Sequence, residues 1–364
     1  MTKQLATAAW PFGLTLADYR ERINEALVKF FEQTPYMLAL DVSPVAQDAL
    51  EKLREYTLRP GKRIRGSLAA AAYDSVAKTI YGESGIMLGV ALELMQSYLL
   101  IVDDVMDESA LRRGQPTIHR LYAAAADIYS NPNETNMLAI NVGLIGQHLA
   151  NLALVDAPES SEWIVATLRS VHHNITATGF GQLDDLYQRA GRKVTQPDII
   201  RKYRYKSSYY TFINPLEAGL VLGGMAGEVA HREAVAFGEA AGIAFQLHDD
   251  LLGIFGDTSV MGKSNIDDIQ EGAYTLLVYY ALQHATPRDV AELRAALGNQ
   301  HLKSSDMLRI QEIFEVSGAS AFVRAEVVRY GDIARQALAA STIWDESFKA
   351  RLTELLDYVI TRQS

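Results

Sequence analysis

The sequence predicts an all-α protein, a single large bundle of about a dozen helices around a central cavity. Apolar residues recur with the helical period along most of the 364 residues. The alternation typical of strands is absent from the sequence, and so are the Asn-Gly and Asp-Gly signals of hairpins. No low-complexity linker or fixed-period repeat divides the chain, so we expect residues 1–364 to form one domain.

The first half of the chain begins with two capped helices. Thr15-Leu-Ala-Asp18 is a capping box that predicts a helix to about residue 31. Ser43 followed by Pro44 predicts a second helix to about residue 56, because Pro is favoured at the first helical position. Arg59-Pro-Gly61 should end that helix. Two more helices are expected at about residues 63–77, which are rich in alanine, and 85–108.

The second half continues the helical pattern. Polar turn formers at residues 130–136 predict a surface loop. Pro215 should kink or break a helical segment that covers residues 197–225. A further loop is predicted at residues 256–268. The remaining helices are expected at about residues 136–154, 160–190 and 228–255, and from about residues 286, 305, 319 and 346.

Composition excludes several classes of function. The net charge of −10 argues against sequence-independent binding to nucleic acid or to an anionic membrane surface. The chain has no cysteine, which excludes disulfides, a thiol nucleophile and zinc–thiolate sites and fits a cytoplasmic protein. We see no signal-peptide pattern, and no uninterrupted apolar run approaches the ~18 residues that a membrane span needs.

A cluster of carboxylates ends the apolar run at residues 93–102. Asp103 and Asp107 would lie one turn apart on one helical face, with Asp104 about 100° round. Such carboxylates repel one another unless water or a hard cation lies between them, and Mg²⁺ commonly bridges carboxylates to substrate phosphates. Arg112 and Arg113 follow and can bind phosphate. The alternative is a solvated acidic helix end, which is the commoner meaning of one such cluster.

A second acidic pair favours the metal site. Asp249 and Asp250 follow another apolar helical run. Two acidic pairs on two helices are suited to hold several Mg²⁺ ions on one diphosphate, if they face each other across a cavity.

In their order along the chain, the motifs resemble those of the polyprenyl synthetase family, the trans-isoprenyl diphosphate synthases. The resemblance covers about residues 55–285 and rests on Gly61-Lys-Arg-Ile-Arg65, Asp103-Asp-Val-Met-Asp107, Leu111-Arg-Arg-Gly-Gln-Pro-Thr117, Gly181-Gln-Leu-Asp-Asp185, Lys206-Ser207, Phe245-Gln246, Asp249-Asp250 and Gly262-Lys263. Members join isopentenyl diphosphate head-to-tail to an allylic diphosphate and release diphosphate. The resemblance therefore implies the isoprenoid synthase fold, a Mg²⁺-dependent short-chain prenyltransferase and a homodimer.

The resemblance also implies residue roles. About three Mg²⁺ ions per active site would be held on the allylic diphosphate by Asp103, Asp104, Asp107, Asp249 and Asp250. Cationic side chains would bind the same leaving group: Arg112, Lys206 and Lys263. The diphosphate of isopentenyl diphosphate would be bound by Lys62, Arg65, Gln96 and Arg113. Ser207 and Gln246 would lie beside the reacting carbons, Asp185 would order metal-bound water, and the released diphosphate would take the final proton.

Two positions depart from the family's pattern. Gly253 stands where many members have a third Asp, and Ala273 stands where a Lys usually contacts the allylic diphosphate. Because a charge-assisted hydrogen bond contributes about 1.5–3 kcal/mol, we expect weaker substrate binding rather than no activity. These departures keep open a weakly active or regulatory subunit of a hetero-oligomeric synthase. A terpene cyclase is disfavoured by the Gly61–Arg65 element, since a cyclase has no second diphosphate to bind.

Product length should depend on the first acidic helix, along which the prenyl chain would run from Asp103 toward the N-terminus. Leu99 lies roughly 6 Å and Tyr98 roughly 7.5 Å below Asp103 on a helix. In the family, an aromatic at the Tyr98 position without one at the Leu99 position resembles geranylgeranyl (C20) synthases, and farnesyl (C15) product is the close alternative. Tyr98 could equally be a residue of the core.

Overall fold

The computed structural model describes residues 15–37, 43–125, 131–189, 193–256 and 265–362, and within them the all-α prediction is confirmed. The chain divides into two compact units, which we describe separately. Unit 1 comprises residues 1–168 and 218–226, and unit 2 comprises residues 169–217 and 227–364. That the whole chain forms a single domain stays a prediction.

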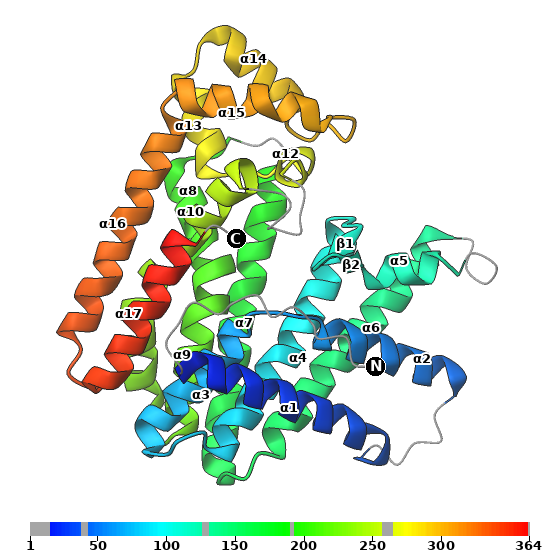
Figure 1. The fold of residues 1–364 in the computed structure, drawn as a ribbon, viewed down its shortest axis with the longest axis vertical. Helices are drawn as coiled ribbons and strands as arrows, with labels where there is room; N and C mark the ends of the chain where they lie inside the picture. The colour runs from blue at the N-terminus through cyan, green and yellow to red at the C-terminus, as the bar shows by residue number, and fades with distance from the viewer. Residues whose placement is uncertain (1–14, 38–42, 126–130, 190–192, 257–264, 363–364) are drawn as a thin grey trace. The chain divides into compact units, whose positions relative to one another are not determined.

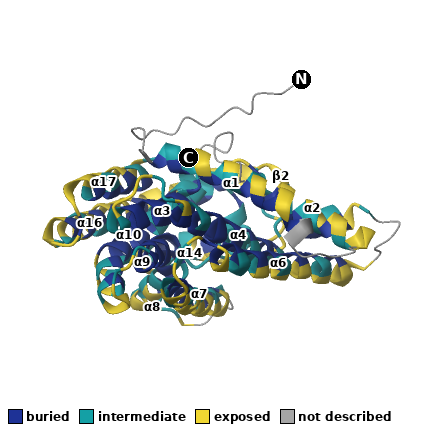
Figure 2. Ribbon diagram, turned by 90° about the horizontal axis from the view of Figure 1, so that it is seen from below, coloured by how far each residue is buried: buried dark blue, intermediate teal, exposed yellow. Residues whose placement is uncertain are grey.

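Unit 1 is built on α4, the apolar helix that carries the first acidic cluster. Its helices are α1 (Thr15–Met37), α2 (Pro44–Leu58), α3 (Ile64–Ala77), α4 (Glu83–Met106), α5 (Ile118–Ala123), α6 (Pro132–Val155) and the start of α7 (Ser161–Arg189). Helix α4 packs against α1, α2, α3 and α6 and is buried along most of its length (Figures 1 and 2). Helix α4 is therefore the central helix of this unit.

The alanine-rich sequence of α3 lets helices approach it closely. Ala69, Ala70, Ala71 and Ala72 are all buried. Gly219, in the part of α9 (Asn214–Leu222) that belongs to this unit, lies so near that a Cβ atom there would be 2.2 Å from the carbonyl oxygen of Ala69. Any larger residue at position 219 would force these helices apart.

A short hairpin in unit 1 was not predicted. Strands β1 (Leu111–Arg112) and β2 (Gln115–Pro116) pair antiparallel. The two turn residues, Arg113 and Gly114, both have positive φ, 53° and 72°. This is the backbone of a two-residue hairpin turn, which Asn-Gly usually forms and which Arg-Gly forms here, so the usual sequence signal is missing.

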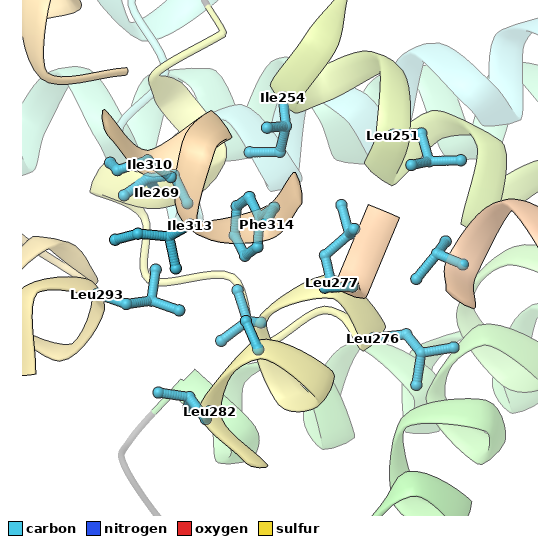
Figure 3. Close-up of a cluster of buried hydrophobic side chains, with 14 of the residues drawn as sticks. Leu251, Ile254, Ile269, Leu276, Leu277, Leu282, Leu293, Ile310, Ile313 and Phe314 are labelled. Atoms are coloured by element: carbon cyan, nitrogen blue, oxygen red, sulfur yellow. The ribbon is translucent and has the colours of Figure 1, made fainter. Parts of the chain in front are cut away.

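Unit 2 is organised around α10 (Gly227–Phe255), which carries the second acidic pair. The unit also contains the end of α7, α8 (Gln196–Lys202), the π-helix η1 (Tyr203–Ile213), α12 (Asp267–Gln270), α13 (Leu276–His284), α14 (Pro287–Ala296), the 3₁₀ turn η2 (Ser304–Asp306), α15 (Met307–Val316), α16 (Ala319–Ala340) and α17 (Glu346–Thr361). Helix α10 packs against η1, α16 and α17 (Figure 1). Its last turns contribute Leu251 and Ile254 to a cluster with side chains of α13 and α15, including Leu277 and Phe314 (Figure 3).

Several predicted boundaries need correction. The segment 197–225 is helical as far as Leu222, but its helix type changes: α8 passes into a π-helix at Tyr203, and α9 begins at Asn214, one residue before Pro215. Residues 132–136, predicted as part of a loop, are the first turn of α6 because Asn131 caps it. Helices α5 and α13 had not been predicted.

Among the helices that the structure describes, two, α4 and α6, are long and apolar enough to cross a membrane by length and composition. In α4 most of the apolar stretch is buried within the protein. In α6 less than half of it is buried. Burial like that of α4 is typical of the core helices of soluble proteins, which pass the same test.

Candidate active site

The first acidic pair lies at the end of α4 and is held by an arginine of the hairpin. Asp104 is fully buried. Arg112 Nε donates to Asp104 Oδ1 at 2.8 Å, and Arg112 Nη2 lies 3.8 Å from Asp103 Oδ2. Burial lowers the pKa of Arg112, but the attraction of Asp104 more than offsets it, so the net pKa is raised. Asp107 is half-buried and ends the helix, since its N–H donates to the Asp103 carbonyl oxygen at 2.8 Å.

Arg113 turns the other way and lies over the loop before α3. Its guanidinium carbon would be 3.0 Å from a Cβ atom at Gly61, so a side chain at position 61 would require the guanidinium to shift. Arg113 Nη1 donates to the Arg59 carbonyl oxygen at 3.1 Å. Burial, and then the neighbouring charge of Arg63, lower the pKa of Arg113. The structure thus brings Arg113 to the Gly61–Arg65 element, with which it was predicted to share a diphosphate.

Within that element the residues divide between structural and candidate binding roles. Arg63 is buried, adopts φ of 49° and pairs with buried Glu93 at 3.2 Å, so it anchors the loop to α4. Lys62 and Arg65 are half-buried on either side of it, and Gln96 is half-buried on α4.

Tyr98 and Leu99, the candidate determinants of product length, are half-buried on α4. The Tyr98 ring lies against α6 at Gly143, where a Cβ atom would be 3.4 Å from Tyr98 Cδ2. The ring therefore packs in the contact between α4 and α6, which are neighbours in unit 1.

The second acidic pair lies on α10, where the π-helix brings side chains to it. Ser207 Oγ donates to Gln246 Oε1 at 2.5 Å, and Gln246 Nε2 donates to Asp250 Oδ1 at 2.9 Å. Burial raises the pKa of Asp250 to about 7, although hydrogen bonds from Tyr203 and Gln246 oppose the shift. The predicted residues Ser207, Gln246 and Asp250 therefore form one chain of hydrogen bonds.

Asp249 has a partner from the C-terminus. The guanidinium of Arg362 pairs with Asp249 Oδ1 and lies 4.8 Å from the centre of the Phe245 ring. The His248 ring nitrogen Nε2 lies 2.8 Å from the Arg362 carbonyl oxygen, and burial lowers the pKa of His248. This contact between Arg362 and Asp249 could not be predicted, because the two residues are 113 positions apart in the sequence.

Lys206 belongs to a cationic cluster around one buried carboxylate. Asp185 accepts from Lys206 at 2.8 Å, from Lys202 at 3.0 Å and from Arg189 at 2.9 Å. Burial raises the pKa of Asp185, but the three cations outweigh burial and the net pKa is lowered. Lys202 and Arg189 were not predicted. Their only sequence signal is helical spacing, because Lys202 precedes Lys206 by four residues and Arg189 follows Asp185 by four.

At each of the two positions that depart from the family's pattern, Gly253 and Ala273, a side chain from another element carries the charge that the usual residue would supply. A Cβ atom at Gly253 would be 2.3 Å from Asp268 Oδ2, so the carboxylate of Asp268 occupies the space where a side chain at 253 would begin. Near Ala273, the buried Lys202 Nζ donates to the Tyr274 carbonyl oxygen at 3.1 Å. A carboxylate and an ammonium are thus present beside these two positions, supplied by other elements.

The donor set fits Mg²⁺ that is shared with a substrate. No group of three or more His, Asp or Glu side chains in the described residues is arranged to hold a metal ion alone. Each acidic pair already contacts a guanidinium, from Arg112 or Arg362, so its carboxylates do attract a cation. Mg²⁺ commonly completes its coordination with water and phosphate oxygens. Lys263, predicted to bind the leaving group, lies outside the described residues.

Comparison with known proteins gives consistent similarities. The polyprenyl synthetase family profile matches residues 47–315. A short chain isoprenyl diphosphate synthase of Methanothermobacter thermautotrophicus is 28% identical over 345 residues, which cover 94% of this chain and 99% of that protein. Human farnesyl pyrophosphate synthase is 28% identical over 317 residues, 82% of this chain and 72% of the relative.

Solved structures agree in fold. The crystal structure of geranylgeranyl pyrophosphate synthase from Corynebacterium glutamicum, complexed with isoprenyl diphosphate and magnesium, has a TM-score of 0.88 and 29% identity. The match covers 96% of this chain and 100% of that one.

Proposed function

Because this chain belongs to the polyprenyl synthetase family, we propose that it is a Mg²⁺-dependent short-chain prenyltransferase whose main product is geranylgeranyl diphosphate. Its substrates would be isopentenyl diphosphate and an allylic diphosphate, joined head-to-tail. The observation that carries the reaction is that one chain of this family presents two Asp-Asp pairs, each already in contact with a cationic side chain.

The carboxylates proposed to hold Mg²⁺ are Asp103, Asp104, Asp107, Asp249 and Asp250. When bound, the ions would neutralise the allylic diphosphate and so favour its departure as an allylic cation forms. The protein's part is to orient the carboxylates.

Cationic residues would bind the two diphosphates. On the leaving group, Arg112 is already fixed by its bond to Asp104, and the Lys206 ammonium is fixed by Asp185 while 31% of the lysine side chain stays exposed. Lys263 would act on the same group. For the second diphosphate we propose Lys62, Arg65, Gln96 and Arg113.

No protein side chain is proposed as general base. Ser207 fixes the amide of Gln246 by donating to its oxygen, so the amide can face the reacting carbons in one orientation. The proton lost from the condensed product would go to the released diphosphate.

For the C20 product, Tyr98 would have to close the path of a longer chain in addition to packing against Gly143 of α6. Similarity to the Corynebacterium geranylgeranyl synthase supports the same product. The similarity to human farnesyl synthase makes farnesyl diphosphate the second candidate.

We also propose a homodimer. Helix α6 exposes Met137, Ile140 and Leu144 at helical spacing. In unit 2, α7 exposes Phe180, Leu183 and Tyr187 with the same spacing. Apolar stripes of this kind usually mark contact surfaces. Light scattering should give twice the mass of the chain, and Leu144→Lys should shift it toward that of the monomer.

The test of the reaction is a product assay. Purified protein, Mg²⁺ and labelled isopentenyl diphosphate are incubated with dimethylallyl, geranyl or farnesyl diphosphate, with Asp103→Ala as the control. We expect Mg²⁺-dependent C20 product that the control lacks. A folded protein that elongates none of the three primers would refute the proposal, whereas C15 product would correct the chain length.

A further inference from the structure

Both Asp-Asp pairs share one construction, in which the second aspartate is buried and the first is accessible. Asp104 is 0% exposed and Asp250 is 6% exposed. The side chains of Asp103 and Asp249 are 28% and 36% exposed. A buried carboxylate must be satisfied by protein donors, because water cannot reach it.

In each pair one of these donors is a buried tyrosine from another element. Tyr56 of α2 donates its O–H to Asp104 Oδ2 at 2.6 Å. Tyr203, the first residue of the π-helix, donates to Asp250 Oδ2 and accepts from the Leu276 N–H at 2.9 Å. Both tyrosines are at most 3% exposed.

The other oxygen of each buried carboxylate is also fixed. Asp104 Oδ1 accepts from Arg112, and Asp250 Oδ1 accepts from Gln246. With both oxygens held, neither carboxylate can rotate without breaking a hydrogen bond. The tyrosine therefore fixes the orientation of the pair on its helix.

We propose that Tyr56 and Tyr203 are positioning residues that hold the two acidic pairs in the orientation that binds a divalent cation. The proposal rests on the function proposed above. Neither tyrosine needs to touch the cation, since partners that orient metal ligands commonly change metal affinity about 10–100-fold when they are removed.

The chain offers a matched control. Tyr19 of α1 donates its O–H to Asp74 Oδ2 of α3, and both residues are buried. This is the same type of hydrogen bond, in residues that we assign to no part of the reaction. Tyr19→Phe should therefore cost stability as the other two substitutions do, without affecting the cation.

The experiment is a Mn²⁺ titration of the full chain with inorganic diphosphate, in which free Mn²⁺ is measured by electron paramagnetic resonance. We expect Tyr56→Phe and Tyr203→Phe each to raise the apparent Kd for Mn²⁺ about tenfold or more. Tyr19→Phe should change it less than twofold. Prenyl transfer by the two test variants should need more Mg²⁺ for half-maximal rate but approach the wild-type kcat at saturating Mg²⁺.

Urea unfolding of each variant separates positioning from loss of structure. A raised Kd for Mn²⁺ in a variant whose free energy of unfolding matches that of Tyr19→Phe supports the proposal for that acidic pair. Affinities equal to that of Tyr19→Phe in both variants would overturn it while leaving the proposed function intact. Wild-type protein that binds no Mn²⁺, or whose binding survives Asp103→Ala and Asp249→Ala together, would refute the proposed function and this inference with it.

Discussion

Asp250 should make the metal-free protein less stable as the pH rises. Burial raises its pKa to about 7 from 3.8 in the unfolded chain. Between these two pKa values the unfolded chain releases a proton that the native protein keeps, so stability falls by about 1.36 kcal/mol per pH unit. Over about three units the loss is about 4 kcal/mol. This loss of stability is absent below the pKa of Asp250 in the unfolded chain and complete above pH 7.

Asp250→Asn removes this loss, because an amide does not ionise. The amide has one acceptor oxygen instead of two, so either Tyr203 or Gln246 loses its acceptor, at a cost of about 1–3 kcal/mol. At pH 8 the variant should therefore be more stable than the wild type by about 1–3 kcal/mol. At pH 4, where the ionisation contributes almost nothing, the variant should be less stable than the wild type by about 1–3 kcal/mol.

The assay is urea unfolding with a chelator at pH 4, 6 and 8. The lost hydrogen bond contributes equally at every pH, so the change in the stability difference between pH 4 and pH 8 isolates the ionisation and should be about 4 kcal/mol. A difference that stays constant with pH would refute the reasoning from burial. Activity should be lost at every pH if Asp250 helps to hold Mg²⁺.

Three further substitutions test other parts of the site. Asp185→Asn leaves three cations without their buried carboxylate and should lower the free energy of unfolding by about 3–5 kcal/mol in urea, and a loss below 1 kcal/mol would contradict that charge balance. Arg362→Ala frees Asp249 and should tighten Mn²⁺ binding several-fold by electron paramagnetic resonance; weaker binding would mean that the guanidinium does not compete with the cation. Tyr98→Ala should lengthen the products seen by chromatography. Products of unchanged length would mean that another residue limits the length of the chain.

Helices with strong apolar periodicity could be predicted well. The bounds of α4 and α10 lie within about two residues of those expected, because a buried face repeats at the helical period. The π-helix η1 could not be predicted, since its wider turn changes which residues share a face without changing composition. The error matters for function, because η1 carries Tyr203, Lys206 and Ser207.

The acidic pairs could be predicted because their signal is local, whereas their partners could not. Tyr56 and Asp104 are 48 residues apart, and Tyr203 and Asp250 are 47 apart. Spacing along a helix says nothing about such contacts, which depend on how helices pack. A single sequence therefore identifies which carboxylates gather but not which groups hold them.

The same limit explains why the two departures from the family's pattern looked like losses. A motif records which position in the sequence carries a charge. The interaction of that charge with a diphosphate or a cation depends on its distance in space. Asp268 fills the space beside Gly253, and Lys202 brings an ammonium to the turn at Ala273 and Tyr274. The case for a weakly active subunit rested on these two positions. Asp268 places a carboxylate beside Gly253, whereas the Lys202 ammonium is buried and paired with Asp185, so it does not replace the Lys that contacts the allylic diphosphate in the family. A full rate of chain elongation by the isolated protein would show that the reaction does not need that contact.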